Sequence, residues 1–234
     1  MESKVAVTHP NAARATASTL GVLAGLGGIT HGIGEILQGN TAPQGIMIYS
    51  WTQGPIAAHM GGEPAMTIVP NLFATGVLTI LVSLALLVWA ATLVQRKNGG
   101  WIQILLSVCM LLTGGGFAPP IMGILSGVAG LGINASYTWW RKHLSAGVRH
   151  GLAKAWPWIF GLCAIDGVFL VIGSVILVFI FSVNAPNLFV ACFLLAVGTV
   201  PLAILTGIAY DVENSNPQPA TKNEVGNPAV SSES

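Results

Sequence analysis

One stretch of the sequence decides how often the chain crosses a membrane: residues 101–138, WIQILLSVCMLLTGGGFAPPIMGILSGVAGLGINASYT. It is apolar almost throughout. About 20 residues of helix cross the hydrocarbon core of a bilayer, so this stretch is long enough for one broken helix or for two short ones. The Gly-rich and Pro-rich run at residues 114–120 is typical of a turn. The stretch alone therefore leaves one crossing and two crossings open.

The basic residues decide between these alternatives. Lys and Arg near membrane spans stay on the cytoplasmic side. Two crossings place residues 96–97 and the basic segment 141–154 on the same side, whereas a single crossing separates them. With two crossings, all nine basic residues share one side: Lys4, Arg14, Arg96, Lys97, Arg141, Lys142, Arg149, Lys154 and Lys222. We therefore predict two crossings in this stretch and cytoplasmic termini.

The composition indicates an integral membrane protein. Only 7% of the residues are charged and 53% are hydrophobic, whereas soluble domains have about 25% charged residues. We predict an all-α, six-helix transmembrane bundle in the plasma membrane. The expected spans are 18–38, 67–94, 101–118, 120–138, 157–182 and 187–209. The remaining regions are a polar cytosolic segment (1–17) before the transmembrane domain (18–210) and a disordered cytosolic tail (211–234).

Several classes of partner and cofactor are not expected. The net charge is +1, and no basic patch lies outside the short loops, so we predict no nucleic-acid partner. The lipid bilayer is the expected partner. Cys109, Cys163 and Cys192 lie in apolar runs without a CxxC pattern and are interpreted as packing residues. No phosphate loop, Rossmann glycine pattern or HExxH motif is present, and the sequence identifies no cofactor.

Three ionisable side chains are predicted inside the membrane: His31, Glu35 and Asp166. Such groups cost roughly 2.5–3.5 kcal/mol on insertion scales, so they usually face protein or water and often serve function. No Lys or Arg is predicted within a span to pair with the two acids. At about 1.5 Å per residue, Asp166, His31 and Glu35 lie roughly 14, 20 and 26 Å from the cytoplasmic edge. If the first and fifth spans are neighbours, the three residues form a polar ladder, and the alternative is a structural hydrogen-bond cluster.

Small residues mark the helix faces that are expected to pack closely. Steps of three and four residues return to the same side of a helix, and glycine there lets another helix approach. In the first span this stripe consists of Gly21, Gly25, Gly28 and Gly32; in the fourth it consists of Gly123 and Gly127. His31 and Glu35 lie on the flank of the first stripe, so we predict that they face the bundle interior.

The segment 39–66 is the only long external segment, and it has no Lys or Arg. It is expected to lie on the outer leaflet or to fold back over the bundle as a lid. His59 and Glu63 repeat the spacing of His31 and Glu35, and two such pairs are a ligand set that a metal ion accepts. Glycine and proline at 61, 62 and 64 break the helical regularity. We therefore interpret His59 and Glu63 as solvated loop residues and predict no metal site.

These features leave three functional hypotheses. The first is a small permease or proton- or ion-coupled carrier that uses the polar ladder; at 234 residues such a carrier is expected to form a homo-oligomer. The second is a membrane-embedded enzyme for a lipid or isoprenoid substrate, with Glu35 or Asp166 as general acid. The third is a non-catalytic scaffold or accessory subunit. A water-lined path favours the carrier, an apolar cavity with converging acids favours the enzyme, and the absence of a cavity favours the scaffold.

Overall fold

The structure is a computed structural model that describes residues 11–215. The described chain is mainly helical. Its only strands are β1 (Met47–Tyr49) and β2 (Pro64–Met66), which pair antiparallel. The helices are α1 (Ala12–Leu37), α2 (Gly54–Met60), α3 (Leu72–Thr92), α4 (Gly99–Leu112), α5 (Ala118–Gly132), α6 (Thr138–His143), α7 (Ala146–Val168), the π-helical turn η1 (Phe169–Gly173), α8 (Ser174–Phe181) and α9 (Pro186–Asn214).

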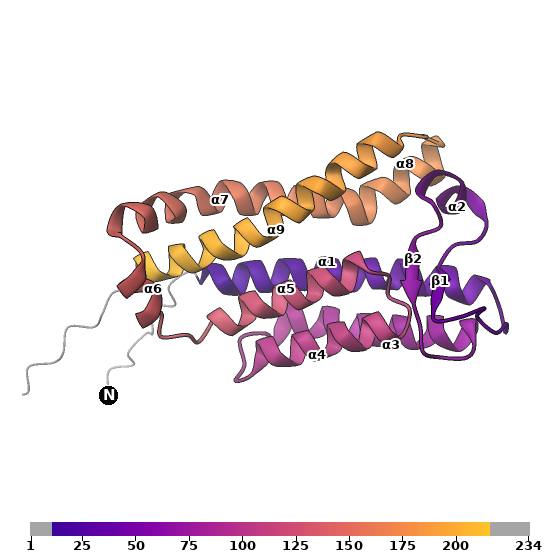
Figure 1. Ribbon diagram of the computed structural model, residues 1–234, viewed down its shortest axis with the longest axis horizontal. Coiled ribbons are helices and arrows are strands. Elements are labelled where there is room, and N and C mark those ends of the chain that lie inside the picture. Colours follow the sequence, from indigo (N-terminus) through magenta and orange to yellow (C-terminus); the bar gives the residue numbers. More distant parts are fainter. Residues whose placement is uncertain (1–10, 216–234) are drawn as a thin grey trace, which may run out of the picture.

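The long helices run side by side along one axis (Figure 1). Helices α1, α3, α4 and α5 form one group, in which α1 packs mainly on α3 and α5. The second group consists of the continuous segment α7–η1–α8 and of α9, which packs mainly against α7. We call the end covered by α2, β1 and β2 the hairpin end, and the opposite end the α6 end. The residues between α1 and α3 fold back over the helix ends. Of the two arrangements expected for segment 39–66, this is the lid.

Four helical segments are long and apolar enough to cross a membrane: α1, α3, α7–η1–α8 and α9. Residues 101–138 contain two separate helices, α4 and α5, joined by a turn at 113–117. These helices have 14 and 15 residues, fewer than the about 20 that a full crossing needs. Helix length alone therefore supports four crossings and does not confirm the six that were predicted.

Both ends of the helical domain extend further than predicted. Helix α1 begins at Ala12, so the expected polar segment 1–17 overlaps it; Asn11 caps the helix by accepting from the backbone N–H of Arg14. Helix α9 continues to Asn214, so the tail prediction is wrong for residues 211–214. Asp211 is buried there and accepts from Ala12 N at 2.7 Å and Ala13 N at 2.9 Å. The carboxylate satisfies free N–H groups of the first turn of α1. Residues 1–10 and 216–234 lie outside the described residues.

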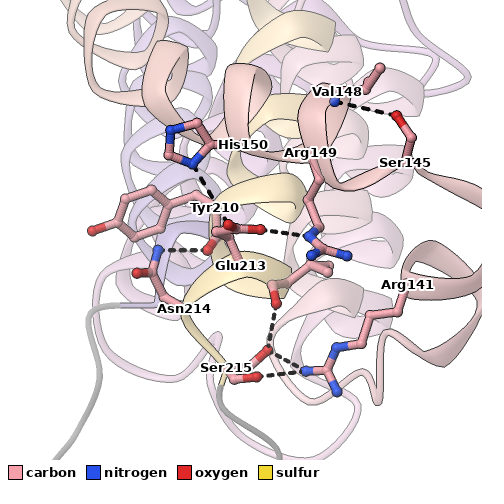
Figure 2. A network of polar contacts seen from close by, with 10 residues as sticks. Arg141, Ser145, Val148, Arg149, His150, Tyr210, Glu213, Asn214 and Ser215 are labelled. Carbon is pink, nitrogen blue, oxygen red and sulfur yellow. Dashed lines mark hydrogen bonds and ion pairs between the residues drawn. The ribbon is translucent and has the colours of Figure 1, made fainter.

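A polar network fastens α6 and α7 to the last turn of α9 at the α6 end (Figure 2). Arg149 Nε lies 2.6 Å from a carboxylate oxygen of Glu213. The Arg141 guanidinium donates to the Ser215 carbonyl at 2.8 Å and to its hydroxyl at 2.7 Å. This network, together with the Asp211 contacts, brings the two ends of the described chain to the same end of the bundle.

Glycine allows the helices of the first group to approach closely. A Cβ at Gly32 of α1 would lie 2.8 Å from the Gly76 carbonyl of α3, and one at Gly25 would lie 2.8 Å from the Ser83 carbonyl. In the α4–α5 pair, a Cβ at Gly127 would lie 2.8 Å from the Gly100 carbonyl. Larger residues at these positions would force the helices apart, which explains the spacing seen in the sequence.

Candidate functional site

Glu35 is the single acidic residue of α1, and 0% of its surface is exposed. One carboxyl oxygen accepts from the hydroxyl of Ser50, which follows β1, at 3.1 Å. The other lies 3.3 Å from the hydroxyl of Thr79 on α3, which also donates to the Thr113 carbonyl in the α4–α5 turn. Its hydrogen-bond partners among the described residues are thus hydroxyl groups, with no cation among them.

His31 lies one helical turn earlier and joins the same cluster. Its Nδ1 is 2.8 Å from the Ser50 hydroxyl, so Ser50 bridges His31 and Glu35. The Ser50 hydroxyl has a single proton and donates it to Glu35. It therefore accepts from His31, and Nδ1 carries a proton. The two residues that were predicted to touch are connected through this serine.

Glu63 and His59 reach the same place from the segment between α1 and α3. The carboxyl Oε2 of Glu63 lies 3.5 Å from His31 Nε2, and its side chain is 21% exposed. Burial raises the pKa of Glu63 to about 7. Glu63 Oε2 and His59 Nδ1 are buried atoms without a hydrogen-bond partner among residues 11–215. The interpretation of these two residues as solvated loop residues is therefore corrected, because the lid turns them toward the helices.

The described residues contain no group of three or more His, Cys, Asp or Glu side chains arranged to hold a metal ion. His31, His59 and Glu63 are close, but only the His31–Glu63 contact lies within ion-pair distance. The donors therefore do not form a ready coordination shell, and we assign no metal to them.

The α4–α5 turn forms one wall of this cluster. Gly114 and Gly116 have φ values of +109° and +75°, a region that side chains with a Cβ rarely adopt. A Cβ at Gly114 would overlap the Glu35 carboxyl, and one at Gly116 would overlap the His31 ring. Both glycines are needed for the turn and for the space that the two side chains occupy.

A cavity of about 690 Å³ lies between the two helix groups. It is lined by α1 and α5 on one side and by α7, η1, α8 and α9 on the other, with the lid at one end. Apart from the Cys163 thiol, its only polar side chains are Thr30, His31, His59 and Glu63. On α9 the lining extends from Pro186 to Pro201, about 22 Å along the helix at about 1.5 Å per residue. The cavity is thus long and apolar, with a polar hairpin end.

The lid and the π-helical turn shape this cavity. Trp51 of the lid packs edge-on against Phe179 of α8, with ring centroids 6.1 Å apart, so the lid connects the two helix groups. Leu170 and Val171 of η1 line the cavity wall. A π-helical turn holds one extra residue, and such turns occur frequently at functional sites. The widened helix is therefore placed where a ligand would contact it.

Asp166 lies apart from His31 and Glu35. No hydrogen bond or ion pair joins it to either residue in the described part of the chain, and it does not line the cavity. Its neighbours include the thiols of Cys163 and Cys192. The adjacent Gly167 faces Leu23 of α1, and Asp166, about 100° further around the helix, lies beside Cys192 of α9. The predicted three-member ladder is not formed.

Sequence reasoning missed a row of neutral polar residues inside the first helix group. Thr75, Thr79 and Ser83 recur every four residues on α3, and all are completely buried. In the same helix group, Gln103 of α4 donates to Ser126 of α5 at 2.5 Å. The period of four in an apolar span was a readable signal, but only ionisable residues were considered. Ser50 and Asp211 were missed as well, because both lie outside the predicted spans.

Neither a protein-family model, nor a curated protein, nor a solved structure matches this chain. The geometry of the cavity and of the polar cluster is therefore the basis for assigning a function.

Proposed function

We propose that the chain crosses the membrane six times, with the α6 end in the cytoplasm. The α4–α5 hairpin lies beside α1 and α3 and presents Trp101, Leu105 and Val128 outward as exposed apolar residues. Strand β2 leads into a backbone contact, Ile68 N to Leu112 O at 3.1 Å, that covers the hairpin's turn. The lid thus occupies the part of the membrane thickness that α4 and α5 are too short to cross.

The distribution of charge gives the orientation. The basic residues of the described chain lie in or beside α6, at the starts of α1 and α7, and in the α3–α4 connection. These segments belong to the α6 end, which the positive-inside rule assigns to the cytoplasm. A reporter fused at residue 222 is expected on the cytoplasmic side and one inserted within residues 39–66 on the other. Finding both on the same side would contradict this orientation, which four and six crossings share.

Within this frame the protein binds a lipid-like amphiphile, with its chain in the cavity and its polar group against His31, His59 and Glu63. The observation that carries this proposal is the cavity itself, which is apolar except at the hairpin end. Binding sites for small molecules have this pattern of apolar walls with few placed polar groups. Each methylene group buried there contributes about 0.8 kcal/mol, so a long chain supplies most of the binding energy.

The polar cluster adds acid–base chemistry at the head of that molecule. Thr79 has one hydroxyl proton, and the Thr113 carbonyl can only accept it, so the Glu35 contact with Thr79 draws on a proton of Glu35. His31 Nδ1–H then donates to Ser50, which leaves Nε2 facing Glu63 as a proton acceptor. His31 Nε2 can therefore take a proton from the head group, and the hydrogen bonds through Ser50 to Glu35 hold the imidazole ring in place for that step. This supports a membrane-embedded enzyme that protonates or deprotonates the head group.

A proton- or ion-coupled carrier is the second candidate. Its specific support is the buried polar row of Thr75, Thr79 and Ser83, together with Ser83 Oγ, which has no hydrogen-bond partner in the described part of the chain. The row extends the polar cluster toward the α6 end. For this candidate, Glu35→Gln is expected to abolish proton-coupled flux in reconstituted vesicles. The cavity itself weighs against a purely structural scaffold.

The binding proposal is tested by filling the cavity. Ala196 lines it, whereas Ala191 is exposed on the same helix and does not. We expect protein purified from membranes to retain an amphiphile at near one-to-one stoichiometry, measured by mass spectrometry of extracts. Ala196→Trp should lose it and Ala191→Trp should keep it. Equal lipid content in both variants would contradict the proposal.

A further inference from the structure

Within residues 11–215, no Lys or Arg lines the polar end of the cavity, so this end has no cation to bind a phosphate group. The lid segment, residues 39–66, contains no Lys or Arg. The described basic residue on α1, Arg14, lies 17 residues (31 − 14) from His31, about 26 Å along the helix at about 1.5 Å per residue. Phosphate recognition in proteins relies on Arg forks or Lys ammonium groups. Only the imidazoles of His31 and His59 are placed to contact a head group here.

The helix ends that border the cavity are also poor anion sites. Helix N-termini usually bind anions through their free N–H groups. Helix α5 begins with Pro119 and Pro120 in its first turn, and α9 begins with Pro186; all except Pro120 line the cavity. Proline has no backbone N–H, so these two helix N-termini present fewer N–H donors than helix N-termini without proline.

A cationic head group is no better matched. Glu63 is the only carboxyl group on the cavity wall, and it lies 3.5 Å from His31 Nε2. The other titratable groups on the wall near Glu63 are the imidazoles of His31 and His59. An imidazole donates or accepts a proton but does not attract a cation. Two buried atoms of wall residues, the nitrogen His59 Nδ1 and the oxygen Glu63 Oε2, have no hydrogen-bond partner among the described residues.

Resting on the proposed function, we propose that the bound molecule is a neutral lipid: a long apolar chain, such as an isoprenoid, that ends in a hydroxyl or carbonyl oxygen. That oxygen takes up the unused hydrogen-bonding capacity of His59 Nδ1 and Glu63 Oε2 next to His31. The chain follows α9 toward Pro201 along the cavity's length of about 22 Å. A phosphorylated lipid would find no Lys or Arg on the described wall, and a quaternary-ammonium lipid would find only the Glu63 carboxyl group, which already contacts His31.

Farnesol and farnesyl phosphate test this inference, because they share one chain and differ only in the head group. The full-length protein in lipid nanodiscs is titrated with each compound, and binding to empty nanodiscs is subtracted. We expect farnesol to bind at least about tenfold more tightly, since the buried phosphate would lack a charge-assisted partner. Ala196→Trp should abolish binding of farnesol, and Ala191→Trp should leave it unchanged.

His59→Lys provides the complementary variant. It places an ammonium group in the last turn of α2, next to the cavity. We expect farnesyl phosphate to gain roughly tenfold in affinity relative to farnesol. An unchanged ratio of the two affinities would count against charge exclusion.

The outcomes separate the two proposals. If farnesyl phosphate binds as tightly as farnesol, and Ala196→Trp removes both, the neutral head group is wrong and the cavity's function as a binding site stands. If neither compound binds above empty nanodiscs, or if Ala196→Trp binds both like the unaltered protein, the proposed function fails together with this inference.

Discussion

Gly116→Ala is expected to destabilise the protein far more than Gly39→Ala, although the two glycines have nearly the same backbone conformation. Their φ angles are +75° and +76°. A residue with a Cβ in this left-handed region costs about 1–2 kcal/mol, and this cost is common to both variants. The Cβ at position 39 would meet nothing within 4 Å, whereas the one at position 116 would overlap the His31 ring.

The additional loss at position 116 can be worked out from the contacts. Overpacking against a fixed side chain costs about 1–3 kcal/mol. Moving His31 also breaks its hydrogen bond to Ser50, which contributes about 0.5–1.5 kcal/mol. We therefore expect Gly116→Ala to lower the free energy of unfolding by roughly 1.5–4.5 kcal/mol more than Gly39→Ala, measured by reversible unfolding in mixed detergent micelles.

A double variant checks that His31 is the cause. In a His31→Ala background the ring is absent, so Gly116→Ala should cost no more than Gly39→Ala does. Equal effects of the two glycine substitutions in the unaltered background would refute the placement of the α4–α5 turn against His31. A penalty at Gly116 that persists without the imidazole would refute it too.

Two further predictions concern buried acids. The pKa of Glu63 is raised from 4.5 to about 7, so this group stabilises the fold fully below pH 4.5, and its contribution is lost as the pH rises through 7. At about 1.36 kcal/mol per pKa unit, the loss is roughly 3 kcal/mol. In a Glu63→Gln variant, the free energy of unfolding measured from pH 4.5 to 8 should not show this decrease. The same decrease in the variant and in the unaltered protein would contradict the role of Glu63. Asp211→Asn should lower the free energy of unfolding by about 1.5–3 kcal/mol, since charged hydrogen bonds to Ala12 and Ala13 are lost. Glu213→Gln, on the exposed ion pair with Arg149, should change the unfolding midpoint little, and an equal shift in both would refute the capping role.

The sequence alone predicted the parts that local periodicity controls. The stripe of Gly25 and Gly32 follows helical spacing, and the structure brings it against α3. The helical character, the break at residues 113–117 and the placement of His31 and Glu35 toward the interior follow from the same pattern. The helix ends were less predictable, because a buried carboxylate such as Asp211 looks like a polar tail residue until its partner helix is known.

The cavity and its polar end could not be read from the sequence. Ser50 and Glu63 belong to a segment whose path depends on contacts with helices far along the chain, such as that between Trp51 and Phe179. The cavity exists because α8 and the adjoining half of α9 diverge from α1 and α5 toward the hairpin end (Figure 1). Neither relation has a local sequence signal. Asp166 was assigned to the ladder because its depth matched, but its direction around the helix was not known.

The most direct test of the account is to map where each end of a bound lipid lies. Two farnesol analogues are used, one with a diazirine beside the hydroxyl group and one with it at the far end of the chain. After irradiation in nanodiscs, we expect the first to label residues 54–63 and the second to label residues 193–201. Labelling that does not depend on the position of the diazirine, or that falls only on outward-facing residues such as Trp158 and Ile180, would contradict an amphiphile held with its polar group at His31, His59 and Glu63.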